Sequence, residues 1–87
     1  MATVVIPATL RDLCGGALSL EVEGATLDTL LVELDRRCRG FYGRVVEDGR
    51  LRPELAFALD GEVVRLGLHD VVQPAAEITI VPAIGGG

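Results

Sequence analysis

Residues 24–40, GATLDTLLVELDRRCRG, decide the fold because they carry the signals of one amphipathic helix with both ends marked. Gly24 and Ala25 interrupt the pattern before it, and Thr26 is a residue type that caps a helix by accepting a hydrogen bond from a free backbone amide. We predict a helix from Leu27 to Arg39, with Gly40 supplying the left-handed stop.

The side chains of this helix divide into an apolar face and a charged face. The apolar residues recur with helical spacing and predict one buried stripe, made of Leu27, Leu30, Leu31, Leu34 and Cys38. The charged residues predict two exposed ion pairs four residues apart, Glu33 with Arg37 and Asp35 with Arg39. A helix of this kind needs a second apolar surface to cover its stripe.

Stretches with strand character flank the helix and can supply that surface. Residues 3–6 are β-branched, and residues 18–22 alternate so that Leu18, Leu20 and Val22 share the buried face. A turn at residues 14–16 joins these two strands. Beyond the helix, residues 55–59 and 62–65 form a hairpin around the turn dipeptide Asp60-Gly61, and residues 77–81 form the last strand. Residues 41–54 indicate a loop with one helical turn near residues 44–46.

The order of these elements is a hairpin, a helix and then two or three more strands. We therefore predict an α+β fold in which a mixed sheet of four to five strands carries one main helix on one face. With 87 residues the chain has room for one core. We expect a domain at residues 1–82 and a flexible C-terminal glycine tail at residues 83–87.

Charge and composition narrow the classes of partner. The net charge of −5 disfavours nucleic acid and favours basic protein partners. All eight basic residues are Arg, so the side chains offer no amine for an isopeptide bond. No apolar run approaches the length of a membrane helix and no signal pattern opens the chain, which leads us to expect a cytoplasmic protein without membrane contact.

Three side chains that could carry chemistry are interpreted as structural. Cys14 and Cys38 lack metal-ligand spacing, and because the cytosol keeps thiols reduced, two buried thiols are favoured over a disulfide. His69 has no second histidine or nucleophile near it in the sequence and is interpreted as a surface residue. No glycine-rich phosphate loop follows a strand, so we expect the chain to bind no cofactor by itself.

The last three residues, Gly85, Gly86 and Gly87, suggest a reacting C-terminus. The ordinary alternative is a frayed chain end. A terminal glycine carboxylate carries no side chain, so an enzyme can close a narrow channel around it. Its adenylate is a mixed anhydride that a sulfur nucleophile can attack, with ATP, Mg²⁺ and the catalytic residues all belonging to the activating enzyme.

Such a tail needs a docking surface, because ordering it costs about 1–2 kcal/mol of backbone entropy per residue. Strand parity predicts an uncharged face on the side of the sheet away from the helix, formed by Val5, Pro7, Ala56, Ala58 and Val81. The tail residues themselves complete the expected contact with a partner, namely Pro82, Ala83, Ile84, Gly85 and Gly86.

Several motifs of the chain resemble those of the MoaD, ThiS and CysO sulfur carriers over nearly its whole length. They are Ile6-Pro7 with Leu10-Arg11 and Gly15-Gly16, then Asp48-Gly49-Arg50-Leu51, Val64-Arg65, and Val81-Pro82-Ala83-Ile84 before the glycines. The chain is most similar to the CysO-type branch. The resemblance implies a ubiquitin-like β-grasp fold ending at a reactive Gly87.

The same resemblance implies a role as a protein substrate and sulfur donor that is not itself an enzyme. A ubiquitin-activating-type enzyme, MoeB- or ThiF-like, would adenylate Gly87, sulfide would convert it to a thiocarboxylate, and a downstream synthase would accept the sulfur for cysteine, cofactor or secondary-metabolite biosynthesis. We expect a monomer when the carrier is alone. Two alternatives stay open, a ubiquitin-like modifier joined through Gly87 to lysine and a small synthase subunit that inserts its tail into a larger one.

Overall fold

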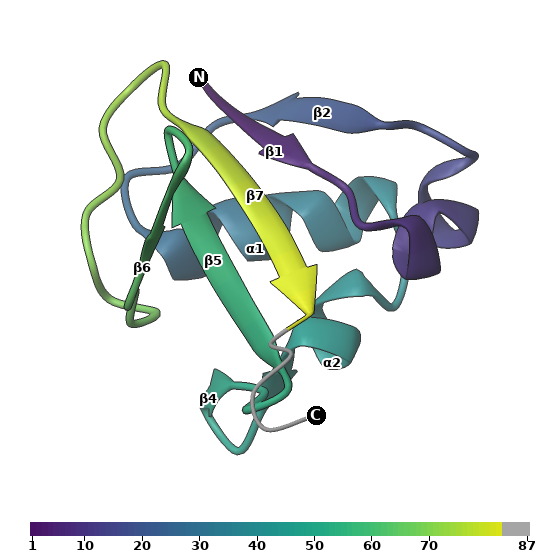
Figure 1. Ribbon diagram of the computed structural model, residues 1–87. Helices are drawn as coiled ribbons and strands as arrows, with labels where there is room; N and C mark the ends of the chain where they lie inside the picture. The colour runs from purple at the N-terminus through teal and green to yellow at the C-terminus, as the bar shows by residue number, and fades with distance from the viewer. Residues whose placement is uncertain (83–87) are drawn as a thin grey trace.

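One mixed sheet with a helix across one face forms the framework of the computed structural model, which describes residues 1–82 (Figure 1). The five strands are β1 (Ala2–Val5), β2 (Ser19–Val22), β5 (Leu55–Leu59), β6 (Glu62–Val64) and β7 (Glu77–Pro82). They lie in the order β2-β1-β7-β5-β6, with β1 and β7 parallel and the other neighbours antiparallel. The predicted α+β fold and mixed sheet are confirmed.

The main helix, α1 (Leu27–Arg37), begins where the sequence predicts and ends two residues earlier. The Thr26 hydroxyl accepts a hydrogen bond from the Thr29 amide, and the Thr29 hydroxyl accepts one from the Thr26 amide, which forms a capping box. At the other end Cys38 leaves helical geometry, and Gly40 has a φ of 92°, the left-handed conformation expected for it.

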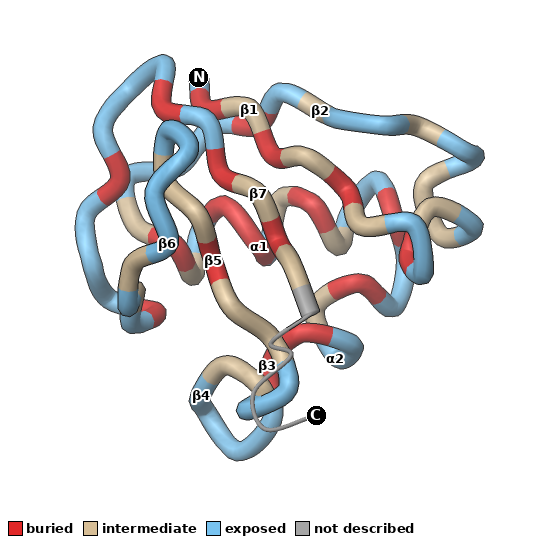
Figure 2. The backbone as a smooth tube through the Cα atoms, viewed as in Figure 1, coloured by how far each residue is buried: buried red, intermediate tan, exposed pale blue. Residues whose placement is uncertain are grey.

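The apolar stripe of α1 packs against the inner face of the sheet. All five predicted stripe residues are buried. The sheet contributes Val4, Phe57, Ile78 and Ile80, which alternate along their strands with less buried residues (Figure 2). The core therefore lies between α1 and the three central strands.

The predicted ion pairs of the helix are wrong. The Asp35 carboxylate accepts hydrogen bonds from the backbone amides of Gly40 and Tyr42, so it caps the next helix instead of pairing with Arg39. Glu33 pairs with Arg36, three residues away, at 3.5 Å. Backbone amides left free at a helix start compete for a carboxylate as strongly as an exposed guanidinium does.

Residues 41–54 hold more structure than the predicted loop. They form α2 (Phe41–Val45) and a small hairpin of β3 (Val46–Glu47) and β4 (Arg50–Leu51). Phe41 and Val45 are fully buried, one helical turn apart. The predicted helical turn is real but begins three residues earlier and ends one residue earlier, because these two side chains anchor it to the core.

The first hairpin also differs from its prediction. A 3-10 helix, η1 (Ala8–Cys14), replaces most of the expected loop and buries Leu10. Gly15 and Gly16 then turn the chain with φ values of 64° and 86°. The expected inner face is wrong at Leu18, which lies just before β2 and is 65% exposed, while Val22 on β2 is buried. As an edge strand, β2 has a neighbour on one side only, and its start escapes the core.

Cys14 and Cys38 form a disulfide, which corrects the expectation of two free thiols. The bond joins the end of η1 to the residue that caps α1, with the two Cα atoms 4.7 Å apart. Sequence spacing could not indicate this, because the pairing depends on η1 carrying Cys14 back over the helix end. Within residues 1–82 no helix is long and apolar enough to span a membrane.

Candidate functional site

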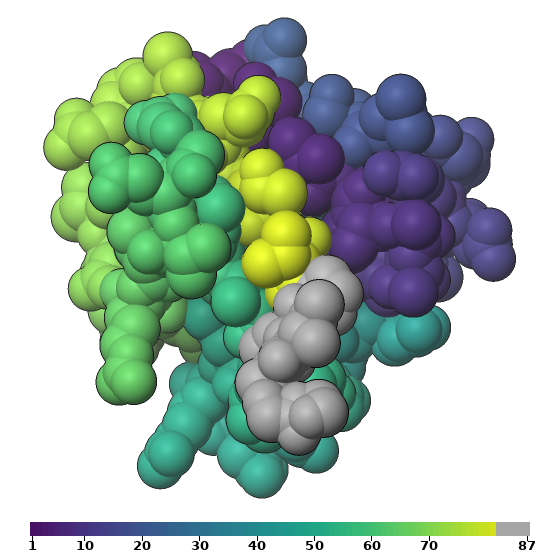
Figure 3. Space-filling model, viewed as in Figure 1, coloured from purple at the N-terminus to yellow at the C-terminus, as the bar shows by residue number. Residues whose placement is uncertain are grey.

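Toward Pro82, the face of the sheet turned away from α1 is formed by small and apolar side chains, whereas at its other end Thr3 lies opposite Glu21 and Glu77. Val5 on β1 lies opposite Thr79 on β7, and Thr79 lies opposite Ala58 on β5. Two residues further along β7, Val81 lies opposite Ala56 on β5. Figure 3 shows this outer face, with β7 running through its middle between β1 and β5.

The structure brings together the residues that strand parity selects for docking. Val5, Pro7, Ala56, Ala58 and Val81 are all half-buried. The residues that alternate with them include the buried side chains of Val4, Ile6, Phe57 and Ile80. Their use as a docking surface stays a prediction.

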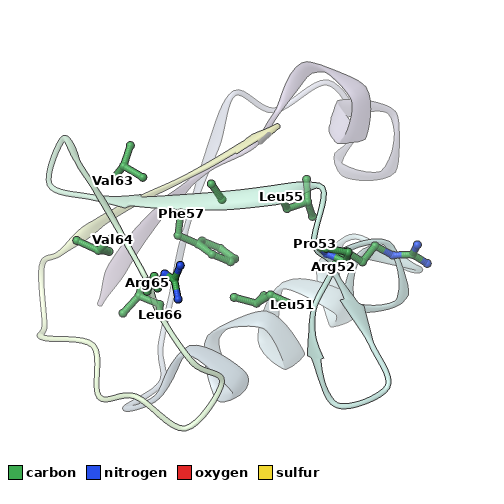
Figure 4. Close-up of a pocket in the computed structure, with 10 residues that line it drawn as sticks. Leu51, Arg52, Pro53, Leu55, Phe57, Val63, Val64, Arg65 and Leu66 are labelled. Carbon is green, nitrogen blue, oxygen red and sulfur yellow. The ribbon is translucent and has the colours of Figure 1, made fainter. Parts of the chain in front are cut away.

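Two members of the face were missed. Thr79 lies between Val5 and Ala58, and Val63 on β6 lies opposite Ala58 with 74% of its surface exposed. Figure 4 shows Val63 on the other side of β5 from the ring of Phe57. The position of Val63 could have been predicted from the Asp60-Gly61 turn. A two-residue hairpin loop sets Leu59 opposite Glu62 and therefore Ala58 opposite Val63.

The strand that leads to the glycines occupies the middle of the sheet. β7 pairs with β1 on one side and with β5 on the other, and its last residue, Pro82, lies opposite Leu55. The predicted tail residues Ala83, Ile84, Gly85, Gly86 and Gly87 lie outside the described residues. The root of the tail is thus fixed beside the apolar outer face.

A hollow of about 310 Å³ adjoins this root. Val5 on β1 and Val81 on β7 line it from the strands, Pro7 lines it from the link between β1 and η1, and Ala8, Thr9 and Arg11 line it from η1. The Arg11 Nε–H donates to the Ile6 carbonyl at 3.1 Å, which fixes the guanidinium at the wall. The docking prediction included the strand side of this hollow but none of η1.

A wider, shallow hollow of about 750 Å³ lies at the β6 edge (Figure 4). Leu51, Leu66 and the ring of Phe57 point into it, and Arg65 lies at its mouth. Its other lining residues are Arg52, Pro53, Leu55, Ala56, Val63 and Val64. No carboxylate, thiol or imidazole is among the residues that line it, so its chemistry suits contact rather than catalysis.

Tyr42 on α2, whose hydroxyl titrates abnormally, lies away from both hollows. The Tyr42 hydroxyl donates to the Asp28 carboxylate on α1, and this hydrogen bond, together with burial and the carboxylate charge, raises the pKa of Tyr42. The bond ties α2 to the start of α1, which is a structural role.

His69 and the acidic residues form no reactive cluster within the described part of the chain. His69 is exposed, and the Asp70 carboxylate beside it accepts the Gly67 amide at 2.7 Å, closing a turn. Among residues 1–82 there is no group of three His, Cys, Asp or Glu side chains placed to hold a metal ion.

Known proteins match the chain along nearly all of its length. The model of the ThiS family matches residues 4–87. The sulfur carrier protein CysO of Mycobacterium tuberculosis is 31% identical over 90 residues, an alignment that covers 98% of this chain and 97% of that protein. Its crystal structure superposes with a TM-score of 0.89.

Two further structures are similar to this one. The crystal structure of the Amycolatopsis orientalis BexX/CysO complex contains a chain that is 34% identical, with a TM-score of 0.89 and complete coverage of both chains. The small archaeal modifier protein SAMP1 of Haloferax volcanii is 24% identical with a TM-score of 0.71, covers 99% of this chain and 98% of its own, and shares the fold.

Proposed function

The chain belongs to the ThiS family and is a ubiquitin-like sulfur carrier of the CysO type, and from this premise we propose that its Gly87 carboxylate is adenylated, converted to a thiocarboxylate and used to donate sulfur. The observation that carries the proposal is the likeness to CysO along the whole chain, combined with a last strand that delivers the glycines from the middle of the sheet. Proteins of this family act as substrates of partner enzymes.

The proposed chemistry takes place in two steps. A Gly87 carboxylate oxygen attacks the α-phosphorus of ATP, which releases pyrophosphate and leaves an acyl adenylate. Sulfide then attacks the acyl carbon and AMP departs, so one carboxylate oxygen leaves with AMP and sulfur takes its place. ATP and Mg²⁺ are bound and used by the activating enzyme, which we propose is of the ubiquitin-activating, MoeB- or ThiF-like type.

The position of the root supports this chemistry. From Pro82 to Gly87 an extended chain reaches about 20 Å at about 3.3–3.6 Å per residue, enough to enter a partner's active site. The absence of a side chain on Gly85, Gly86 and Gly87 lets a narrow channel close around them. The outer face beside the root, centred on Val5, Thr79 and Ala58, would hold the domain against the partner while the tail is inside.

The partners that follow are a basic or mixed-charge activating enzyme and a downstream synthase that accepts the sulfur. A relative captured in a complex, in the Amycolatopsis orientalis BexX/CysO structure, fits a carrier that works by docking to other proteins. We propose that this carrier is a monomer between those encounters and acts in the cytoplasm.

A ubiquitin-like modifier remains the second candidate, favoured by the shared fold of SAMP1. A modifier would transfer the activated Gly87 to a lysine amine on another protein. The two candidates share the adenylation step and differ in the nucleophile that displaces AMP.

Adenylation is tested by ATP–pyrophosphate exchange with the activating enzyme of the same organism. We expect exchange to depend on added carrier and to vanish in a variant with one alanine appended after Gly87. In that variant the terminal residue carries a side chain, and its carboxylate lies one residue too far along the channel. Far-ultraviolet circular dichroism serves as the control that the variant is folded. Unchanged exchange with the appended residue would refute the proposed reaction.

A further inference from the structure

We propose that the hollow between η1 and β7 receives an acidic side chain of the activating enzyme, which pairs with Arg11, and that the Cys14–Cys38 disulfide positions Arg11 for this contact. The inference rests on the proposed function, since it assigns a specific contact to the docking that loading requires. It concerns residues of η1, which lie outside the docking set chosen from strand parity.

The hollow has the size and lining for one inserted side chain. Its volume of about 310 Å³ exceeds that of a glutamate side chain, and Val5, Pro7 and Val81 give it an apolar wall. That wall suits the methylene groups of Glu, while Arg11 is the charged residue in the lining. The hollow is continuous with the outer face through Val5 and Val81, so a protein docked on the face reaches it.

Arg11 is prepared to bind a carboxylate. Its Nε–H donates to the Ile6 carbonyl at 3.1 Å, which leaves the two Nη groups at the end of the guanidinium as donors for a carboxylate. Among the described residues the ion pairs join Arg36 with Glu33 and Arg52 with Glu54, so neither draws on Arg11. A half-buried, pre-oriented guanidinium pairs bidentately with a carboxylate at small entropic cost.

The local charge selects this occupant over others. The chain carries a net charge of −5, and the partner predicted from that charge is basic. The hollow departs from this negative charge, because the charged residue in its lining, Arg11, is a cation and lies beside the root of the tail. An acidic residue within a basic enzyme surface would therefore fix the orientation of the docked carrier.

The disulfide controls where Arg11 lies. Cys14 ends η1 three residues after Arg11, and the bond to the fully buried Cys38 fastens that end to α1. Leu10 holds the start of η1 in the core independently. Losing the bond would thus loosen the end of η1 while the fold persists.

Reduction of this bond is ordinary thiol–disulfide exchange. A dithiol attacks at Cys14, because this residue is partly exposed while Cys38 is fully buried. Two electrons and two protons pass from the dithiol, the S–S bond breaks, both cysteines become thiols and the dithiol becomes a disulfide. Because the cytosol keeps thiols reduced, this exchange would convert the carrier there to its reduced form, which docks less tightly than the disulfide form.

The test measures the KM for the carrier and kcat in ATP–pyrophosphate exchange. We expect Arg11→Gln to raise KM about tenfold, with kcat unchanged, since one interfacial charge pair is lost. Arg11→Lys should recover part of the loss because it restores charge without the fork. The matched control is Arg50→Gln, which removes the same charge from β4, outside the hollow, and should leave KM unchanged.

Two further measurements complete the test. The Cys14→Ala/Cys38→Ala variant should raise KM severalfold, and reductant should raise the KM of wild type, but not of that variant, to the same level.

Four outcomes are decisive. A KM for Arg11→Gln equal to the KM for Arg50→Gln overturns the carboxylate contact, and a cysteine variant with wild-type KM overturns the positioning role. A wild-type dimer that Arg11→Gln dissociates in sedimentation would reassign the hollow to a second copy. Absence of exchange with wild type at every concentration would instead refute the proposed function.

Discussion

Reducing the Cys14–Cys38 disulfide should destabilise the domain without abolishing its fold. The bond closes a loop between residues 24 apart in sequence. In the chain-entropy description such a crosslink removes entropy from the denatured ensemble and thereby raises its free energy by about 3.5 kcal/mol at 25 °C. For a domain of this size, that change lowers Tm by about 14–28 °C. Of the two cysteines only Cys38 belongs to the buried core, and the other buried side chains there do not depend on the disulfide, so a folded reduced state is expected.

Thermal unfolding followed by circular dichroism, with and without a phosphine reductant, measures this effect. Intact mass under denaturing conditions first establishes that the oxidised protein is two hydrogens lighter than the reduced one. The Cys14→Ala/Cys38→Ala variant is the control, and its Tm should not respond to the reductant. Equal Tm values for oxidised and reduced wild type, with the mass difference present, would refute the reasoning that this loop is free in the denatured state.

Three other perturbations follow from single contacts. Thr26→Ala removes the cap of α1 and should cost about 1 kcal/mol in urea unfolding, whereas an effect below a few tenths would show that the capping box is not formed in solution. The pKa of Tyr42 is raised in the folded state by its bond to Asp28, so its contribution to stability is complete below the ordinary tyrosine pKa and is lost as pH rises through the folded value. Tyr42→Phe should therefore flatten the loss of stability above about pH 10, and an unchanged alkaline profile would contradict the assignment. Ala58→Arg at the centre of the outer face should raise the KM for loading at least tenfold, while Val32→Arg on the exposed side of α1 should not, and equal effects would count against the docking face.

The elements that sequence analysis predicted well are those whose signals are local. The start of α1 depends on Thr26 and the apolar spacing behind it, and the β5–β6 hairpin depends on Asp60-Gly61, whose φ values of 49° and 90° suit its tight turn. β7 was also correct, since Ile78 and Ile80 alternate with half-exposed or exposed residues.

The elements that were missed depend on distant parts of the chain. η1 is held by Leu10 in the core and by the bond from Cys14 to Cys38, neither of which has a local signature. The β3–β4 hairpin follows from Phe41 and Val45 anchoring α2, and short strands of two residues carry too few side chains to show a period. The fate of Asp35 was misjudged because the amides it caps belong to the next helix.

The residues of the candidate site that lie on strands could be predicted from the sequence, because strand parity decides which face they occupy. Val5, Ala58 and Val81 follow from counting along strands, and the structure places them on one face. Arg11 could not be found that way, since its place beside Val81 depends on the path of η1. Its presence in the motif Leu10-Arg11 of the resemblance was the only signal in the sequence.

The central claim, that Gly87 carries sulfur, is tested most directly by the intact mass of the chain after incubation with the activating enzyme, ATP, Mg²⁺ and sulfide. We expect a product in which one oxygen is replaced by sulfur, formed only when ATP is present and absent from the variant with a residue appended after Gly87. A carrier whose mass stays unchanged while the adenylate forms, with lysine-linked adducts appearing on other proteins, would contradict the claim and establish a protein modifier instead.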